Sequence, residues 1–220
     1  MFFAMSSAHA SLSVLVYDTT TKQPVISENA DQIRPVASIT KLMTAIISLE
    51  TYGLNSTVNI TKKATRTVKD LLTSLLVKSD NYAAEILARN HPQGRSAFIN
   101  AMNEKARALG LQKTHFEDPS GLINTNTSTA NELVILVETA GRYEFIRRAS
   151  TQITNNTNKT ILEKFSNVVV SKTGFTSKAG RCLVMLVDNQ TKHHAIVILG
   201  ESNKEYRDNL AKTLLLTLNK

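Results

Sequence analysis

The chain has 220 residues, of which 42% are hydrophobic and 20% charged, so it can bury a substantial core in one or two lobes. Lysine and arginine number 26 against 18 aspartates and glutamates, and the net charge of +8 favours anionic surroundings such as nucleic acid, lipid head groups or an anionic cell-wall polymer. The basic residues are scattered, however, without aromatic interleaving, zinc-ligand spacing or a phosphate-binding glycine loop. We therefore expect no nucleic acid partner, no metal and no cofactor. No stretch reaches the roughly 18 uninterrupted apolar residues of a membrane span.

The N-terminal segment MFFAMSSAHA is apolar and small, and it ends in Ala8-His9-Ala10, an A-x-A-like cleavage pattern. It lacks a charged n-region, so residues 1–10 are interpreted as either the remnant of an export signal or a disordered leader. An export signal would place the protein in the periplasm. The single cysteine, Cys182, lies in an apolar run and cannot form an internal disulfide, which predicts a buried, inert thiol.

The first predicted elements are two strands and a helix. Residues 11–18, SLSVLVYD, and the later PVISENA, separated by a polar turn, are typical of a β-hairpin. The hairpin leads into a helix that begins at Ser38, carries apolar residues at helical spacing and stops at Gly53. More helices are expected over residues 68–77, 82–90 and 94–110, and after the capping box formed by Thr129 and Glu132.

The C-terminal part of the chain returns to β character. The polar residues 151–160 predict a surface loop, and strands are expected in FSNVVVSKTG, CLVMLVDN and HHAIVILGE, before a final helix over residues 204–218. Strands at both ends with helices between them predict an α/β (α+β) fold, with one antiparallel sheet formed from both chain ends. Residues 11–220 are expected to be a single domain, with a helical lobe at about 55–150 inserted into the sheet lobe. The active site should lie where the lobes meet.

Ser38 and Lys41 form the first candidate motif, S-x-x-K. Residues three apart lie on one helix face, so the Lys41 amine can reach the Ser38 hydroxyl and act as its base. A lysine can take that proton only when its amine is neutral, a state that burial and a nearby cation both favour. The motif alone is a weak signal, because an N-capping serine beside a solvated lysine gives the same pattern.

Ser79, Asp80 and Asn81 form the second candidate motif, at a turn between two apolar helical segments. The Ser79 hydroxyl could relay a proton to a leaving group, and the Asn81 amide could hold a substrate carbonyl. A helix N-cap is the alternative interpretation, since all three residue types are preferred capping residues.

Lys172, Thr173 and Gly174 form the third motif, at the end of a predicted strand. The glycine would let a substrate backbone approach the strand edge, and Thr173 could bind a carboxylate. Lys172 would supply a cation that keeps Lys41 neutral and attracts an anionic substrate. K-T-G alone is a turn tripeptide, but S-x-x-K, S-D-N and K-T-G in this order are the signature of class A β-lactamases and penicillin-binding proteins.

With these motifs the chain resembles the low-molecular-mass penicillin-binding proteins, serine D-alanyl-D-alanine carboxypeptidases and endopeptidases, and is close to their periplasmic D,D-endopeptidase branch. The resemblance also covers FINAMNEKARALG, FEDPSGL with STANEL, and KTGFTSKAGRCLVM. It implies a β-lactamase/DD-peptidase-like fold, peptidoglycan peptide stems as substrates and β-lactams as inhibitors. By position, it implies that Ser38 is the acylated nucleophile and Lys41 its base, with Ser79 and Asn81 as proton relay and substrate clamp. It implies that the substrate docks on the strand of Lys172, Thr173 and Gly174. The oxyanion hole would be formed by the N–H groups of Ser38 and Phe175.

Two other functions remain open at the level of sequence. A class A β-lactamase would need a further glutamate to activate water, and the candidate, Glu117, lies in EDPSGL, which matches the peptidase pattern instead. A peptidoglycan-binding protein with little or no turnover would keep the same fold. The segments before Ser79 and before Lys172 are shorter than this family leads us to expect, which predicts an open cleft suited to a cross-linked polymer. The sequence leaves open the preference between cross-links and terminal D-Ala, and the oligomeric state.

Overall fold

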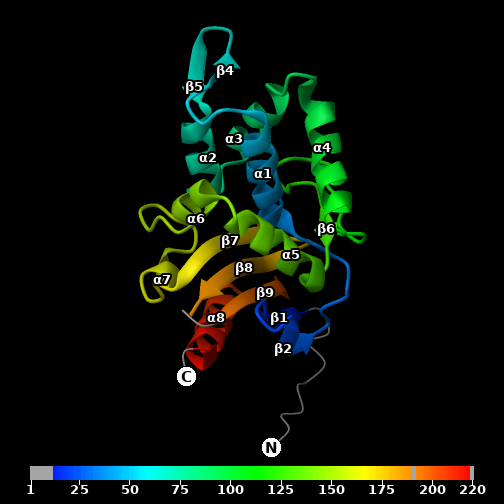
Figure 1. Ribbon diagram of the computed structural model, residues 1–220, viewed down its shortest axis with the longest axis vertical. Coiled ribbons are helices and arrows are strands. Elements are labelled where there is room, and N and C mark those ends of the chain that lie inside the picture. The colour runs from blue at the N-terminus through cyan, green and yellow to red at the C-terminus, as the bar shows by residue number, and fades with distance from the viewer. Residues whose placement is uncertain (1–11, 190–191, 219–220) are drawn as a thin grey trace, which may run out of the picture.

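A five-stranded antiparallel sheet joins the two ends of the chain in the computed structural model, which describes residues 12–189 and 192–218 (Figure 1). The strand order is β2-β1-β9-β8-β7, and β1 pairs with β9 from Ser13↔Leu199 to Asp18↔His194. The predicted sheet is therefore confirmed, whereas the leader over residues 1–10 lies outside the described residues. The strands are β1 (Ser13–Asp18), β2 (Gln23–Glu28), β7 (Val168–Thr176), β8 (Gly180–Asp188) and β9 (His193–Glu201).

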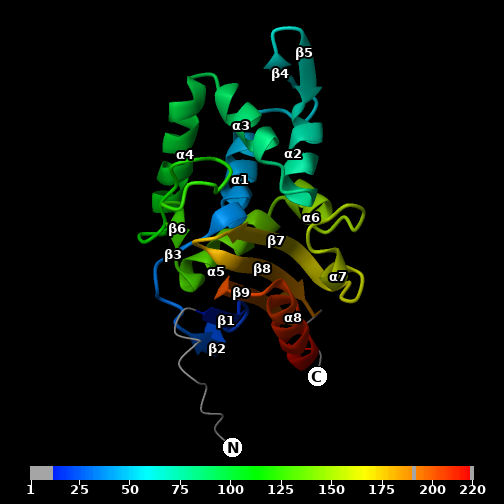
Figure 2. The ribbon, with the colours of Figure 1, turned by 180° about the vertical axis from the view of Figure 1, so that it is seen from behind.

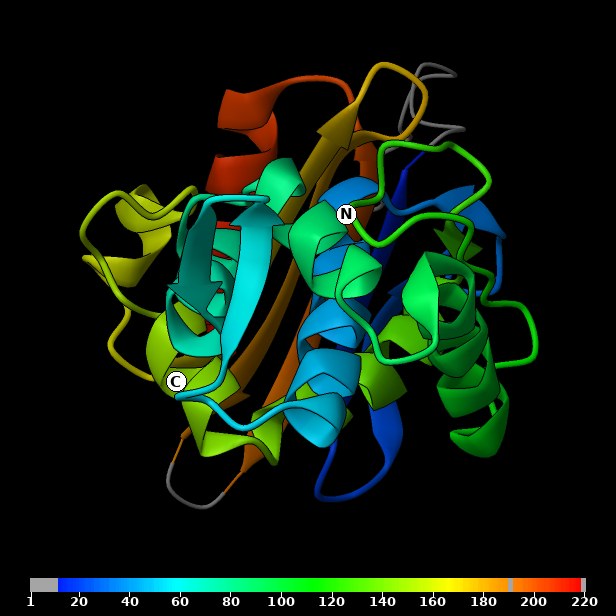
Figure 3. The ribbon, with the colours of Figure 1, turned by 90° about the horizontal axis from the view of Figure 1, so that it is seen from above.

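Helices cover both faces of this sheet and form a lobe beyond one edge (Figures 1 and 2). In the lobe, α1 lies between α2 and α4 in all views, including the view from above in Figure 3, and each of its residues from Lys41 to Ser48 is buried. None of the helices among the described residues is both long and apolar enough to cross a membrane. The helices are α1 (Lys41–Thr51), α2 (Val68–Val77), α3 (Asn81–Arg89), α4 (Gly94–Ala108), α5 (Ala130–Gly141), α6 (Glu144–Ser150), α7 (Lys159–Leu162) and α8 (Lys204–Leu218).

Two hydrophobic cores lie on the two faces of the sheet, because alternate strand residues point to opposite sides. Leu15 and Val197 belong to the larger core, shared with α1 to α5, whereas Val14 and Ile196 belong to the smaller core under α7 and α8. Full burial of one such side chain contributes about 1.5–3 kcal/mol. The consecutive apolar residues of β1 and β9, buried on both faces, thus hold the helical lobe and α8 to the same sheet.

Three features of the segment at 55–150 differ from a purely helical lobe. Strands β4 (Thr57–Thr61) and β5 (Ala64–Thr67) form an exposed hairpin, whose mostly polar sequence gives little signal for a strand. The short strands β3 (Arg34–Pro35) and β6 (Thr127–Ser128) also pair. Helix α5 packs against the sheet, because its apolar side chains belong to the core beneath β1, β8 and β9.

The predicted capping box at α5 is only half formed. The Thr129 hydroxyl accepts a hydrogen bond from the backbone N–H of Glu132 (3.2 Å), as expected of an N-cap. The Glu132 carboxylate does not accept the second bond of a capping box, from the backbone N–H of Thr129. It accepts instead from the N–H of Lys113 and the hydroxyl of Thr114, and so ties the start of α5 to the preceding loop.

Candidate active site

The three motifs meet at a cavity of about 330 Å³ between the helical lobe and the edge strand β7. Gly174 allows this approach: a Cβ there would lie 2.9 Å from the Val36 carbonyl oxygen and 3.0 Å from the Ser38 nitrogen. A side chain would therefore push β7 away from Ser38. The cavity is lined by Ser38, Ser79, Thr157, Thr173, Gly174, Phe175, Arg181, Lys204 and Arg207.

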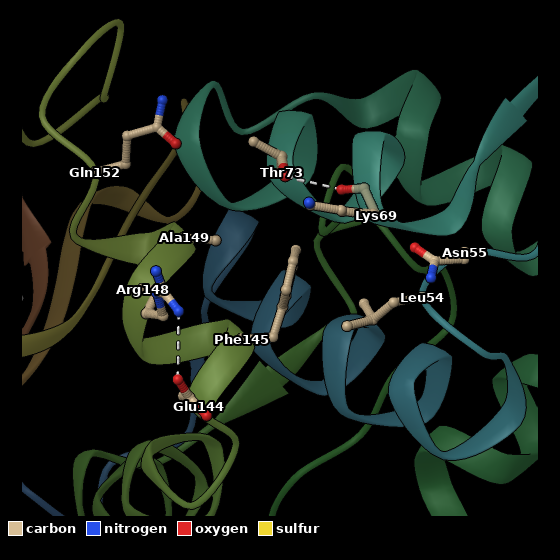
Figure 4. Close-up of a pocket in the computed structure, with 9 residues that line it drawn as sticks. All are labelled: Leu54, Asn55, Lys69, Thr73, Glu144, Phe145, Arg148, Ala149 and Gln152. Atoms are coloured by element: carbon tan, nitrogen blue, oxygen red, sulfur yellow. Dashed lines mark hydrogen bonds and ion pairs between the residues drawn. The ribbon is translucent and has the colours of Figure 1, made fainter.

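A larger cavity of about 730 Å³ lies elsewhere, between the loop after α1, helix α2 and helix α6 (Figure 4). Figure 4 shows its charged groups, among them Arg148 paired with Glu144 and the amine of Lys69. It contains no residue of the three motifs. We therefore place the active site at the smaller cavity, because chemistry rather than size identifies it.

Ser38 lies in one turn of 3₁₀ helix (Ala37–Thr40) that precedes α1, so the expected start of an α-helix at Ser38 is replaced by a tighter turn. Neither this turn nor α1 has a side-chain N-cap hydrogen bond. The Ser38 hydroxyl is instead 2.8 Å from the Lys41 amine. The geometry therefore favours a nucleophile and its base over a capping serine.

The Lys41 amine is completely buried and is surrounded by oxygen atoms. Its Nζ lies 2.8 Å from Ser38 Oγ and 2.7 Å from Asn81 Oδ1, and it also donates to the backbone carbonyl of Ser120. The carbonyl oxygens of Asn81 and Ser120 can only accept hydrogen bonds. A neutral amine, with two hydrogens, therefore gives both to these two oxygens and directs its lone pair at the Ser38 hydroxyl.

Burial lowers the pKa of Lys41 to about 7, while the negative charges of Asp118 and Asp80 oppose this shift. Below that pKa the ammonium has no lone pair to take the Ser38 proton, and above it the neutral amine predominates. We therefore expect the rate constant for acylation by a β-lactam to rise with pH through an acid limb centred near 7. Stopped-flow acylation rates across the pH range test this, and a rate independent of pH below 7 would contradict it.

Because Asp80 caps the helix, Ser79 can line the cavity and Asn81 can bond the Lys41 amine. The Asp80 carboxylate accepts hydrogen bonds from the N–H groups of Tyr82 (2.9 Å) and Ala83 (3.2 Å) at the start of α3. Ser79 adopts a left-handed backbone conformation with φ 59°, which is unusual for a residue with a side chain. The capping interpretation therefore holds for Asp80 alone.

Lys172 is buried beside Ser79. Its Nζ donates to Ser79 Oγ and to the carbonyl oxygen of Thr173, both at 2.8 Å. Burial lowers its pKa well below the ordinary value, and the positive charges of Lys41 and Arg207 lower it further. The sequence interpretation made Lys172 the cation that keeps Lys41 neutral. Burial is the largest cause of the lowered Lys41 pKa, and the two lysines also repel each other, so the role of Lys172 as that cation stays a prediction.

Lys172→Gln tests whether the charge of Lys172, in addition to burial, keeps Lys41 neutral. Glutamine can still hydrogen-bond Ser79 but carries no charge, so we expect weaker substrate binding. Because burial is the largest cause of the Lys41 shift, we expect the acid limb of the pH profile of acylation to stay near pH 7. The pH profile of acylation in the variant, measured beside that of the unmodified protein, provides the comparison. If the limb moved to higher pH, Lys172 would be supplying the charge that holds Lys41 neutral.

The loop 118–123 supplies a part of the site that sequence reasoning missed. The Asp118 carboxylate accepts hydrogen bonds from the N–H groups of Ser120 and Ile123 (both 2.6 Å) and from that of Gly121. Gly121 packs so tightly on the turn before α1 that a Cβ would lie 1.9 Å from the Ala37 oxygen. This loop holds the Ser120 carbonyl against Lys41. The D-P-S-G sequence is a signal for such a turn, but no sequence pattern marks a backbone carbonyl as a functional group.

Other residues of the cavity come from distant parts of the chain and were also missed. Arg207 and Lys204 lie on α8, Arg181 on β8, and Thr157 bonds the Thr173 hydroxyl (2.8 Å). Only the fold brings them beside Ser38. Glu117, the candidate for a β-lactamase, is exposed, accepts a hydrogen bond from Thr125 and does not line the cavity.

The chain is similar to known penicillin-interacting enzymes in both sequence and structure. A family model described as D-alanyl-D-alanine carboxypeptidase matches residues 2–203. D-alanyl-D-alanine endopeptidases of Escherichia coli and Pseudomonas aeruginosa are 35% and 38% identical to it, each match covering 89% of this chain and 73% of the relative.

Solved structures agree with the sequence comparison. The cefotaxime-bound penicillin-binding protein D2 of Listeria monocytogenes is 25% identical, with a TM-score of 0.82 over 92% of this chain and 95% of that one. A mutant of the Streptomyces K15 DD-transpeptidase is 26% identical, with a TM-score of 0.83 over 93% and 95%. The fold and the family resemblance predicted from the motifs are confirmed. The chain belongs to the D-alanyl-D-alanine carboxypeptidase family.

Proposed function

We propose that this protein is a serine D,D-peptidase that hydrolyses D-Ala-containing peptide bonds of peptidoglycan through an acyl-enzyme on Ser38. One observation carries the proposal: a completely buried lysine amine lies 2.8 Å from the Ser38 hydroxyl, with its other hydrogen bonds going to carbonyl oxygens. Such an amine is a base only if it is neutral, and burial brings its pKa to about 7.

Acylation begins when Ser38 Oγ attacks the carbonyl carbon of the D-Ala residue and its proton passes to Lys41 Nζ. A bond forms between Oγ and carbon, and the carbonyl π electrons move to oxygen. The N–H groups of Ser38 and Phe175 are the proposed donors to this oxyanion. Gly174, which lets β7 lie against Ser38, permits these two groups to converge.

The tetrahedral intermediate then expels the leaving amine. The carbon–nitrogen bond breaks, its electron pair goes to nitrogen, and the proton that Lys41 received reaches that nitrogen through the Ser79 hydroxyl. Lys41, neutral again, next takes a proton from water as the water oxygen attacks the ester carbon. The bond between carbon and Ser38 Oγ breaks, Oγ recovers its proton from Lys41, and the products are a carboxylic acid and an amine.

Positive charge around the leaving-group side suits an anionic substrate. The Thr173 hydroxyl and the Arg207 guanidinium line this part of the cavity. Thr173, together with the N–H donors of Arg207 that Asp208 does not accept, is proposed to bind the carboxylate next to the scissile bond. A β-lactam, which also carries a carboxylate, would acylate the same serine. Relatives named as endopeptidases and a cefotaxime-bound structural neighbour support both parts of the proposal. Since peptidoglycan lies outside the cytoplasm, we infer that the protein acts in the periplasm.

Burst kinetics with a chromogenic β-lactam test this function. A D,D-peptidase should release one equivalent of product rapidly and then turn over slowly, because its acyl-enzyme is stable to water. Rapid steady turnover would indicate a β-lactamase instead. No burst and no label would indicate a peptidoglycan-binding protein without catalysis.

A further inference from the structure

Arg181, at the start of β8, has an unusual environment for an arginine in this cavity. Its guanidinium lies over the ring of Phe175, 3.6 Å from the ring centroid, a geometry that favours a cation–π interaction. Its Nε atom is buried and has no hydrogen-bond partner among the described residues. Arg181 and Phe175 are paired across β7 and β8, so the ring fixes the guanidinium at the wall of the cavity that holds Ser38.

The other cations that line the cavity already have partners. The Asp208 carboxylate bonds both Arg207 Nε (2.9 Å) and Lys204 Nζ (2.8 Å). The carboxylate opposite Arg181 in the sheet is that of Glu201, and it accepts hydrogen bonds from the N–H groups of Ser202 (2.7 Å) and Asn203 (3.1 Å). Among the ion pairs of the described residues, none involves Arg181. Within the part of the chain that the structure describes, no carboxylate therefore compensates its positive charge.

An uncompensated guanidinium in a partly buried cavity attracts a carboxylate, which it can bind through two parallel hydrogen bonds. Arg207 and Thr173 are already assigned to the carboxylate next to the scissile bond. We propose that Arg181 binds a second carboxylate of the leaving group and so determines substrate preference. This inference rests on the proposed peptidase function.

The consequence is a preference between the two kinds of D-Ala bond. A terminal D-Ala leaves with one carboxylate, whereas the leaving half of a cross-linked stem is itself a peptide with further carboxylates. Arg181 thus favours cleavage of cross-links over removal of a terminal D-Ala. The preference that the sequence left open is set by a residue on β8, outside all three motifs.

Two synthetic peptides with the same acyl half, ending in D-Ala-D-Glu or D-Ala-D-Gln, isolate this effect because their leaving residues differ by one carboxylate. For the unmodified protein, kcat/KM should be roughly tenfold higher for the D-Glu peptide, the order of magnitude of one charge-assisted hydrogen-bonded pair. In Arg181→Gln this ratio should fall to about one. Arg181→Lys, which keeps the charge but loses the planar fork, should give an intermediate ratio.

Arg66→Gln is the matched control, because Arg66 is exposed on the β4–β5 hairpin and does not line the cavity. It removes the same charge and should leave the ratio unchanged. An equal ratio in the unmodified protein and in Arg181→Gln would overturn the inference. If Arg181→Gln cleaves neither peptide, the Arg181→Lys ratio decides: a reduced ratio supports the inference and an unchanged one overturns it. Failure of the unmodified protein to cleave either peptide would overturn the proposed function itself.

Discussion

Ser38→Ala is expected to abolish labelling by a fluorescent penicillin and hydrolysis of D-Ala-D-Ala peptides while the protein stays folded. The hydroxyl is the proposed site of acylation, because it lies 2.8 Å from the buried Lys41 amine, whereas the Ser79 hydroxyl accepts its hydrogen bond from Lys172. Its loss should lower the free energy of unfolding by only about 1 kcal/mol, since it makes one hydrogen bond and caps no helix. Gel fluorescence measures the label and thermal denaturation measures the stability. A labelled Ser38→Ala protein would remove Ser38 from the mechanism.

Lys41→Met is expected to lose acylation almost as completely, by roughly 10²- to 10⁴-fold, the contribution typical of a general base. Methionine fills a similar volume without an amine, so the core around α1 keeps its packing. The rate constant for penicillin acylation, measured at pH 8 where most of the unmodified protein should hold neutral Lys41, gives the comparison. Acylation of the variant at an undiminished rate would show that a different group takes the Ser38 proton.

The same variant also tests the pKa of Lys41 through stability. The folded protein holds this amine at a pKa of about 7, below the ordinary 10.5, so between these values the unfolded chain binds more protons. Stability should therefore rise with pH across this window, by at most about 1.4 kcal/mol per pH unit from this group. The burial of Lys41 destabilises the folded protein most below pH 7, and this destabilisation disappears above pH 10.5. Subtracting the urea-unfolding free energies of Lys41→Met from those of the unmodified protein isolates this slope. A flat difference would mean that Lys41 keeps its ordinary pKa in the folded protein.

The sheet and the three motifs could be predicted from the sequence because their signals are local. Short runs of consecutive apolar residues mark β1 and β9, and Ser38 and Lys41 are neighbours on one helical turn. The contributions missed are those that only tertiary structure creates. The Ser120 carbonyl, which bonds Lys41, belongs to a loop far away in the sequence. Arg181 lines the same cavity as Ser38 only because of the place of β8 in the sheet. The exposed β4–β5 hairpin was missed because a mostly polar strand has no buried face to mark it.

The environment of Lys172, more than its residue type, also governs the pKa of its amine. The sequence places a cation at this position but says nothing about how deeply it is buried. The structure buries both Lys41 and Lys172 almost completely, so desolvation is the largest cause of the lowered pKa of each amine. The two lysines thus act in a site where burial, more than mutual repulsion, makes a neutral amine available near neutral pH.

Mass spectrometry of purified muropeptides shows directly whether this protein cleaves peptidoglycan cross-links through Ser38. Cross-linked dimers and pentapeptide monomers are incubated with the unmodified protein or with Ser38→Ala, and the products are separated and weighed. We expect the unmodified protein to convert dimers into monomers faster than it removes terminal D-Ala, and Ser38→Ala to leave both substrates intact. Identical muropeptide profiles for the two proteins would contradict it.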